Sequence, residues 1–114
     1  MPRERIAIWP SDRASRMNTK AAETLTGART ITQAEIERYN AFAFDPGGAP
    51  RDVVLPAAAA CKGAYIYIAN TADAAEVITI NTSAGADICT PTQAETAFLW
   101  CDGTSWYGHV GANS

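Results

Sequence analysis

Short runs of β-branched and aromatic residues between Arg51 and Val110 constrain the fold of this chain most. The runs read RDVVLP, GAYIYIAN, EVITIN and AFLWCDGTSWYGHV, and Pro, Gly, Asn or Asp interrupts each of them. Such residues favour strands, and turn formers at these intervals set the strand lengths. The block predicts a mainly β fold, a small antiparallel sandwich or roll.

The expected strands cover 53–55, 64–70, 76–81, 88–90, 97–101 and 104–110. Between the last two, Asp102-Gly103 matches a two-residue type I′ hairpin turn, whose central residues need φ > 0. One short helix is expected at about 33–40, because Thr32 can cap it and Glu35 can reach back to Thr32. A single helical turn is expected in the alanines after Pro56.

Both faces of the two most regular strands are apolar. Successive side chains of a strand point to opposite faces, so the aromatic residues separate from the aliphatic ones. The first face holds Tyr65, Tyr67, Phe98 and Trp100, and the second holds Ile66, Ile68 and Leu99. Either the sheet folds over its aromatic face or that face meets another subunit.

Subunit contact is the favoured interpretation of the aromatic residues. Tyrosine and tryptophan are enriched at protein interfaces, and a domain this small has a thin core of its own. The expected interface residues are Tyr65, Tyr67, Trp100 and Trp106.

Residues 1–29 are expected to form an extended N-terminal arm, and residues 30–114 the β-domain. The arm shows no sustained hydrophobic period, and its main apolar cluster is Ile6-Ala7-Ile8-Trp9. Such a segment can dock in a partner's groove, add a strand to a partner's sheet, or fold back on its own domain. The long polar stretch that follows the cluster favours an intermolecular role.

Charge is divided unevenly along the 114 residues. Residues 1–30 hold six Lys or Arg and three Asp or Glu, whereas residues 31–114 hold three and nine. The arm is therefore basic and the domain acidic, so that neighbouring copies can attract one another or the arm can seek an acidic surface. A solvated tail is the third possibility.

The sequence contains no convincing catalytic constellation, so we expect a non-enzymatic protein without a cofactor. His109 is the only histidine, and no GxSxG motif accompanies it. A zinc site from Cys61, Cys89, Cys101 and His109 would lack the closely spaced ligand pairs of structural zinc sites. The aspartates and glutamates stand mostly at expected turns, where they cap backbone groups.

Nucleic-acid and membrane partners are not expected either. The acidic domain argues against nucleic acid, which is bound by basic and aromatic residues on one surface. The N-terminus lacks the apolar core of a signal peptide, and no run approaches the about 18 apolar residues of a membrane span. We therefore expect synthesis in a cytoplasm. The odd number of cysteines, without CxxC spacing, predicts buried thiols.

Residues 52–110 resemble small β-modules of tailed-bacteriophage virions. The shared pattern is a strand ending in LP, a G-x-x-I-x-I-x-N strand, a VITI-type strand and an L-x-x-DG-x-x-W hairpin. The matching residues are Leu55-Pro56; Gly63, Ile66, Ile68 and Asn70; Val77 to Ile80; and Leu99, Asp102, Gly103 and Trp106. The match covers about half of the chain and marks strands and turns rather than a binding site.

Modules of this kind occur in head decoration (cement) proteins and at the tips of tail fibres. Resemblance to the first group implies a homotrimer on the capsid exterior, which binds the major capsid protein where capsomers meet and stabilises the shell. The start at Met1, read as the start of a complete chain, and the arm both favour decoration.

No motif match covers the arm, so its role follows from position and composition. The expected capsid-binding residues are Arg3, Arg5, Ile6, Ile8, Trp9, Arg13 and Arg16. The alternative function is a receptor- or glycan-binding module at a tail-fibre tip, with Asp102, Trp106 and Tyr107 at the hairpin as its platform.

Overall fold

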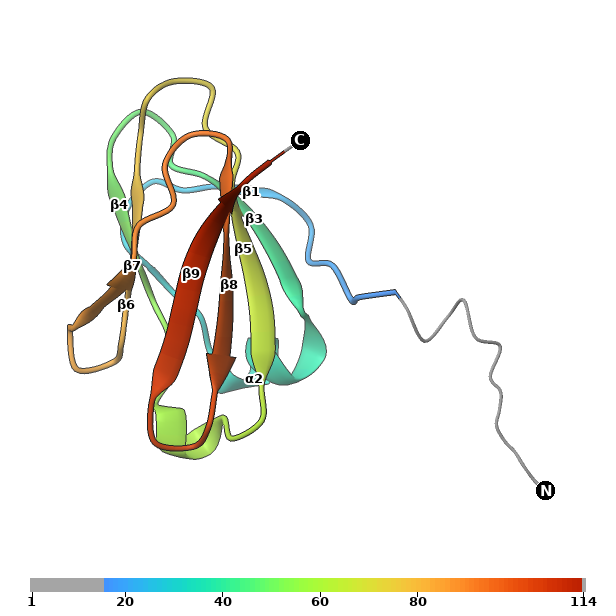
Figure 1. Cartoon of the computed structure of the whole chain (residues 1–114). Coiled ribbons are helices and arrows are strands. Elements are labelled where there is room, and N and C mark those ends of the chain that lie inside the picture. The colour runs from blue at the N-terminus through green and yellow to red at the C-terminus, as the bar shows by residue number, and fades with distance from the viewer. Residues whose placement is uncertain (1–15, 114) are drawn as a thin grey trace.

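The computed structural model describes residues 16–113, which form two β-sheets around one core (Figure 1). The five-stranded sheet, sheet A, has the order β1 (Glu23–Thr24), β3 (Ala41–Asp45), β5 (Tyr65–Asn70), β8 (Glu95–Cys101) and β9 (Trp106–Ala112). The four-stranded sheet, sheet B, has the order β2 (Arg29–Thr30), β4 (Arg51–Val54), β6 (Ile78–Asn81) and β7 (Asp87–Cys89). The prediction of a mainly β fold is confirmed.

The sheets are mixed, so the prediction of an antiparallel arrangement is wrong. From β1 to β6 the chain alternates between the two sheets, and it returns to each sheet running in the same direction. Strands β1, β3 and β5 are therefore parallel neighbours, and so are β2, β4 and β6. Only β7, β8 and β9 are added by antiparallel pairing.

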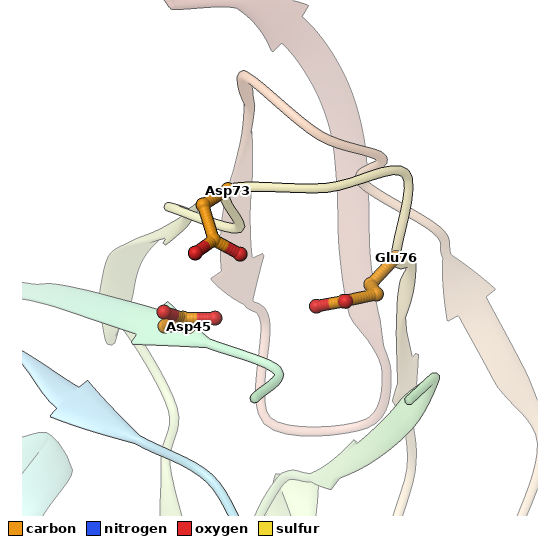
Figure 2. A group of neighbouring side chains, drawn as sticks. All are labelled: Asp45, Asp73 and Glu76. Carbon is orange, nitrogen blue, oxygen red and sulfur yellow. The ribbon is translucent and has the colours of Figure 1, made fainter. Parts of the chain in front are cut away.

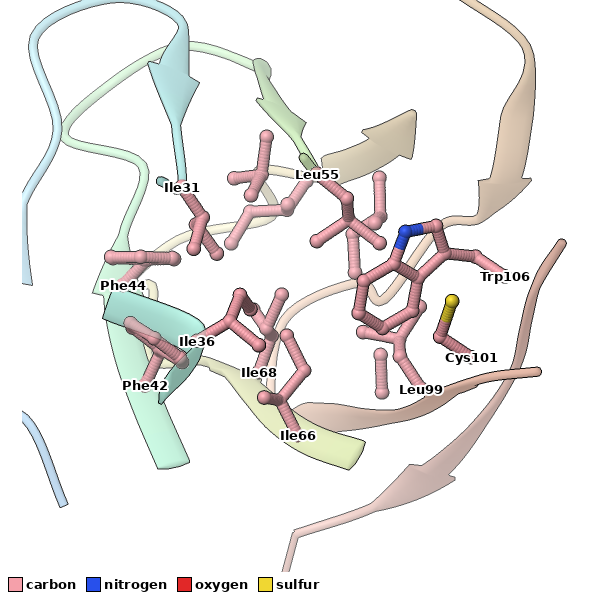
Figure 3. Packing of buried hydrophobic residues seen from close by; sticks show 14 of the residues in the cluster. Ile31, Ile36, Phe42, Phe44, Leu55, Ile66, Ile68, Leu99, Cys101 and Trp106 are labelled. Atoms are coloured by element: carbon pink, nitrogen blue, oxygen red, sulfur yellow. The ribbon is translucent and has the colours of Figure 1, made fainter. Parts of the chain in front are cut away.

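Aliphatic side chains from both sheets fill the space between them (Figure 3). Ile66, Ile68 and Leu99 of sheet A are fully buried, as are Ile78 and Ile80 of sheet B. Each fully buried aliphatic side chain of this size contributes roughly 1.5–3 kcal/mol. The predicted alternation in 64–70 and 97–101 is thus confirmed, with the aliphatic residues inward.

The predicted short helix is α2, Gln33–Arg38. Its capping box is complete, because Glu35 N donates to Thr32 Oγ1 at 3.2 Å and Thr32 N donates to Glu35 Oε1 at 3.0 Å. The helix ends two residues before the expected limit because Tyr39 is already extended and leads into β3. The predicted turn after Pro56 is the 3₁₀ helix η2, Ala58–Ala60. Among residues 16–113, no helix is long and apolar enough to cross a membrane.

The domain begins earlier than predicted. Strand β1 pairs with β3, β2 pairs with β4, and Leu25 is buried in the core. The expected boundary between residues 29 and 30 therefore falls inside β2. The described part of the expected arm contributes strands to both sheets, although its polar sequence gives no strand signal. Residues 1–15 of the arm lie outside the described residues.

The hairpin between β8 and β9 has a four-residue loop, not the predicted two-residue type I′ turn. Cys101 pairs with Trp106, and of the loop residues only Gly103 has a positive φ, of 94°. The Asp102 carboxylate accepts hydrogen bonds from Thr104 N and Ser105 N, both at 2.8 Å, and so holds a wider turn. A type I′ turn would require a positive φ at Asp102 as well.

Arg29 joins the two sheets near their N-terminal strands. Its guanidinium donates to Glu23 at 2.9 Å and to Glu35 at 2.7 and 2.9 Å, and it also donates to Thr30 O. Glu23 belongs to β1 in sheet A, Arg29 to β2 in sheet B and Glu35 to α2. The Arg29 hydrogen bonds are the first cause that lowers the pKa of both carboxyls to about 2.

Gly108 of β9 lies where sheet A packs closely against β7, at the edge of sheet B. A Cβ at this position would lie 2.8 Å from Leu99 Cδ2, 3.2 Å from Ile88 Cγ2 and 3.3 Å from Cys89 Sγ. Ile88 and Cys89 lie in β7, so a side chain here would push β9 and β7 apart. Gly111 on the same strand has nothing within 4 Å of its Cβ position.

We predict that Gly108→Ala lowers the free energy of unfolding by about 1–3 kcal/mol, the usual cost of overpacking. Gly111→Ala is the matched control and should change it by less than about 0.5 kcal/mol. Urea denaturation followed by tryptophan fluorescence measures both values. Equal effects of the two substitutions would contradict the packing described for Gly108.

We also predict that Arg29→Met destabilises the protein by about 2 kcal/mol at pH 7, because two partly buried carboxylates lose their partner. The lowered pKa values mean that the wild-type contribution is present above pH 4.5 and is lost as the pH falls toward about 2. The difference between wild type and variant should therefore shrink over that range. Arg38→Met, at an exposed arginine of α2, is the control in the same denaturation series.

Candidate functional site

The outer face of sheet A carries two rows of aromatic side chains across β5, β8 and β9. The first row is set by the pairing of Tyr65 with Trp100 and of Trp100 with Tyr107. The second row pairs Tyr67 with Phe98 and Phe98 with His109. Every second residue of each strand points to the same face, so the rows follow from the strand period and the register. We call these six side chains the aromatic face.

The first row is the more exposed. Tyr65, Trp100 and Tyr107 retain 48%, 45% and 43% of their accessible surface. The Trp100 and Tyr107 rings are stacked, with centroids 4.7 Å apart and planes at 30°. This stacking holds a flat apolar surface toward solvent. Exposed aromatic area of this extent usually marks an interaction surface.

The second row packs more closely. The Tyr67 and Phe98 ring centroids lie 5.0 Å apart, and the Phe98 and His109 centroids 5.9 Å apart. Tyr67 and Phe98 are half-buried by these neighbours, whereas His109 is exposed. His109 thus belongs to the rim of an aromatic surface, and its contact with Phe98 gives it a structural role.

A shallow depression of about 470 Å³ lies at the hairpin end of the aromatic face. Tyr65, Phe98 and Trp100 form much of its lining, and Lys62 and Asp102 lie at its polar rim. The depression is mainly apolar, so it suits a side chain or another flat apolar surface better than a charged ligand.

Asp102 fixes the conformation of the β8–β9 hairpin loop at this end of the aromatic face. Besides its two backbone partners, its carboxylate accepts a hydrogen bond from Tyr107 Oη at 3.0 Å. The hydrogen bonds from the Ser105 and Thr104 amides lower the pKa of Asp102, followed by the smaller contribution of Tyr107. The carboxylate therefore stays charged at neutral pH and orients the Tyr107 ring beside Trp100.

Of the predicted interface residues, Tyr65, Tyr67 and Trp100 lie together on the aromatic face. Trp106 does not, and its inclusion was wrong: it is 6% exposed, faces the core beside Leu99 and Cys101, and donates from Nε1 to Pro56 O at 2.9 Å (Figure 3). A buried tryptophan needs this partner for its N–H group. It also cannot serve as part of an exposed binding platform.

The arm residues proposed to bind the capsid mostly lie outside the described residues. These are Arg3, Arg5, Ile6, Ile8, Trp9 and Arg13. Arg16 is the first described residue, and it is exposed. Its exposure is compatible with contact to a partner.

The cysteines are placed as structural groups. Cys61 and Cys101 are buried, Cys89 is half-buried, and none of them forms a disulfide. Burial raises the pKa of Cys61 and Cys89, so these thiols are poor nucleophiles at neutral pH. No zinc-type cluster of these cysteines with His109 occurs in the described part of the chain.

Asp45, Asp73 and Glu76 form a carboxylate cluster that the sequence did not bring together (Figure 2). One oxygen of each lies within 4.8 Å of the others, and this is the one such cluster among residues 16–113. Asp45 accepts a hydrogen bond from Gly47 N at 2.9 Å, and Glu76 accepts one from Gly48 N at 3.2 Å. Glu76 thereby holds the 45–48 turn against the β5–β6 loop, and Asp73 of that loop lies beside these two carboxylates.

The aromatic face is therefore the strongest candidate site in the described part of the chain. Its exposed, stacked aromatic side chains give it the character of a surface for association. Comparison with known proteins adds no assignment: no family model, curated protein or solved structure matches this chain.

Proposed function

We propose that this chain is a non-enzymatic structural protein of a phage virion, which assembles as a trimer, decorates the capsid exterior and stabilises it. The aromatic face carries the proposal, because it leaves three large aromatic side chains nearly half exposed on one side of a small domain. The resemblance of residues 52–110 to phage virion modules supplies the setting. In that setting the partner is the major capsid protein.

The aromatic face is the proposed contact between subunits. Tyr65, Trp100 and Tyr107 would be covered on assembly, and the half-buried Tyr67 and Phe98 would support them. Aromatic residues contribute large, stiff contact areas and lose little conformational freedom on binding. Burial of this row removes the apolar surface that a monomer leaves in water.

The charge division supplies an attraction to the capsid lattice. Residues 1–16 hold four Arg against two Asp or Glu, whereas residues 17–114 hold five Lys or Arg against ten Asp or Glu. Lys20 and Arg29 are ion-paired with Glu23 or Glu35 within the domain. A basic arm on each subunit of a trimer gives several weak contacts at once, and their avidity exceeds the affinity of one arm. Decoration would then hold neighbouring capsomers together, so that a shell under internal pressure must break more contacts to open.

One observation favours a second candidate, a glycan-binding module at a tail-fibre tip. Stacked Trp100 and Tyr107 beside the charged Asp102 provide an apolar platform next to a hydrogen-bond acceptor. Sugars offer an apolar C–H face and hydroxyl donors, which such a pair can bind. This function would use the same residues without subunit contact, so the oligomeric state separates the two candidates.

We predict that Trp100→Glu converts the trimer into a monomer, because each interface would bury an unpaired charge. Sedimentation velocity at micromolar concentration measures the change. Ala34→Glu places the same charge on the exposed surface of α2 and should leave the trimer intact. A wild-type monomer that binds oligosaccharides, with binding lost in Trp100→Glu, would support the glycan-binding candidate instead.

We further predict that the full chain sediments with expanded, undecorated heads of the phage that encodes it. Replacing Arg3, Arg5, Arg13 and Arg16 by Gln should weaken this binding, and added salt should weaken wild-type binding in the same way. Pelleting followed by gel densitometry measures the bound fraction. Wild-type protein that stays in the supernatant at low salt would refute the decoration proposal.

A further inference from the structure

A second surface lies where the two sheets meet along one side of the domain, and of the aromatic face it shares Tyr107 alone. In Figure 1 the β6–β7 hairpin stands beside β9. A groove of about 590 Å³ is lined by residues of the hairpin loop and of β9. Pro56, Ala58 and Ile88 provide apolar lining, whereas Thr82, Ser83 and Asp87 provide polar lining from the hairpin. Trp106, Tyr107 and Gly108 form the β9 side.

Both strands beside the groove are edge strands. β9 is the last strand of sheet A and β7 the last strand of sheet B, so within residues 16–113 each pairs on one side only. In an antiparallel pair, every second residue of a strand forms hydrogen bonds with its partner strand. Asp102 N donates to Ser105 O at one end of the β8–β9 hairpin, and Asn113 N donates to Ala94 O at the other, so these bonds show which residues of β9 face β8. By that alternation the backbone groups of Gly108 and Val110 point away from β8. An open edge of this kind accepts an added strand.

The charge and the polar lining of the groove indicate what kind of peptide segment can bind in it. Among the described residues, Asp87 is its one lining carboxylate, and no Lys or Arg lines it. The hydroxyls of Thr82, Ser83, Thr104 and Ser105 provide further hydrogen-bonding groups. A segment that fits must therefore offer a free backbone edge, small or aliphatic side chains for the apolar lining and a positive charge near Asp87.

The arm contains a segment with these properties. In the run RERIAIW, which ends at Trp9, Ile6 and Ile8 alternate with Arg5 and Ala7. As an added strand, the run would place both isoleucines on one face, while Arg3 and Arg5 would carry positive charge on the other. No other run before residue 16 combines β-branched residues with arginine in this way. This segment lies outside the described residues, so the argument for it rests on sequence.

The described start of the chain lies on the far side of sheet A from the groove. Thr19 bridges to Ala41, and Asn18 O accepts hydrogen bonds from Asn40 N and Ala41 N, next to β3. β5 and β8 separate β3 from β9 in the sheet order. The chain enters the domain on one side and the groove lies on the other. Binding of one copy's arm in the groove of the next copy is therefore a head-to-tail contact. Such contacts close into rings when the rotation allows it.

We propose that residues 3–9 of one copy add a strand along β9 of a neighbouring copy, in the groove beside the β6–β7 hairpin. Fifteen residues span up to about 50 Å when extended, so the arm can reach an adjacent domain. The proposal deepens the proposed function, since it names the partner of the apolar part of the arm. It rests on that function only in requiring that copies assemble, and it does not require a capsid.

Photocross-linking of the full chain tests the proposal. Trp9 is replaced by benzoylphenylalanine, and equal amounts of ¹⁵N-labelled and unlabelled protein are mixed before irradiation. We expect cross-links between a labelled and an unlabelled chain, mapped by mass spectrometry to residues 82–88 or 104–110. The same probe at Met17, an exposed residue beyond the segment, is the matched control and should not give these products.

A charge exchange adds specificity to this test. Asp87→Arg should reduce the cross-linking yield several-fold, and combining it with Arg3→Glu and Arg5→Glu should restore the yield. Cross-links within one chain, cross-links that map to Tyr65, Tyr67, Phe98 or Trp100, or no cross-links at all would each overturn the proposal. If groove cross-links form in protein that fails to bind capsids, the decoration function fails while this inference stands.

Discussion

The burial of aliphatic side chains between the two sheets is the interaction on which the rest of the structure depends. Ile66, Ile68 and Leu99 fill the core from sheet A, and they alternate with Tyr65, Tyr67, Phe98 and Trp100 along the same strands. Because the side-chain period of a strand is two, burial of one set forces the other outward. The aromatic face is therefore a direct consequence of the core, and a register that hid it would expose the isoleucines.

The path of the chain explains how so short a sequence encloses this core. Alternation between sheets makes β1, β3 and β5 parallel neighbours in sheet A, and β2, β4 and β6 parallel neighbours in sheet B. The antiparallel strands added last leave β9 and β7 at an edge of each sheet. Arg29 ties β1, β2 and α2 together at one side, and the absence of a side chain at Gly108 lets the sheets approach at the other. The domain thus presents two surfaces for association, an aromatic face and a groove between edges, and the proposed assembly uses both.

Much of this fold could be predicted from local sequence, and the misses have physical causes. The runs 64–70 and 97–101 and the Thr32 capping box carry strong local signals. Strands β1 and β2 carry no such local signal. Their extended conformation depends on tertiary pairing with β3 and β4. The AFAFD run of β3 was a missed signal, since alternating phenylalanines at Phe42 and Phe44 indicate a strand buried on one face. Parallel pairing follows from the long-range path, which local patterns do not encode.

The candidate site was predicted in part. Strand parity places Tyr65, Tyr67 and Trp100 on one face, and it places Tyr107 and His109 there as well. The register of the hairpin decides only which rings these two residues lie beside. The error at Trp106 was avoidable, because a loop of either two or four residues leaves Trp106 on the same face as Leu99. The carboxylate cluster and the groove depend on contacts between distant loops, and no spacing in the sequence indicates them.

Hydroxyl-radical footprinting across the assembly transition tests the central claim most directly. Oxidation rates of Tyr65, Trp100 and Tyr107 are compared at concentrations below and above assembly, with buried Trp106 as the internal reference. The account predicts that the three exposed residues become protected on assembly, while Trp106 stays slow throughout. Assembly that leaves the oxidation of Trp100 and Tyr107 unchanged would contradict the claim that the aromatic face is the contact between subunits.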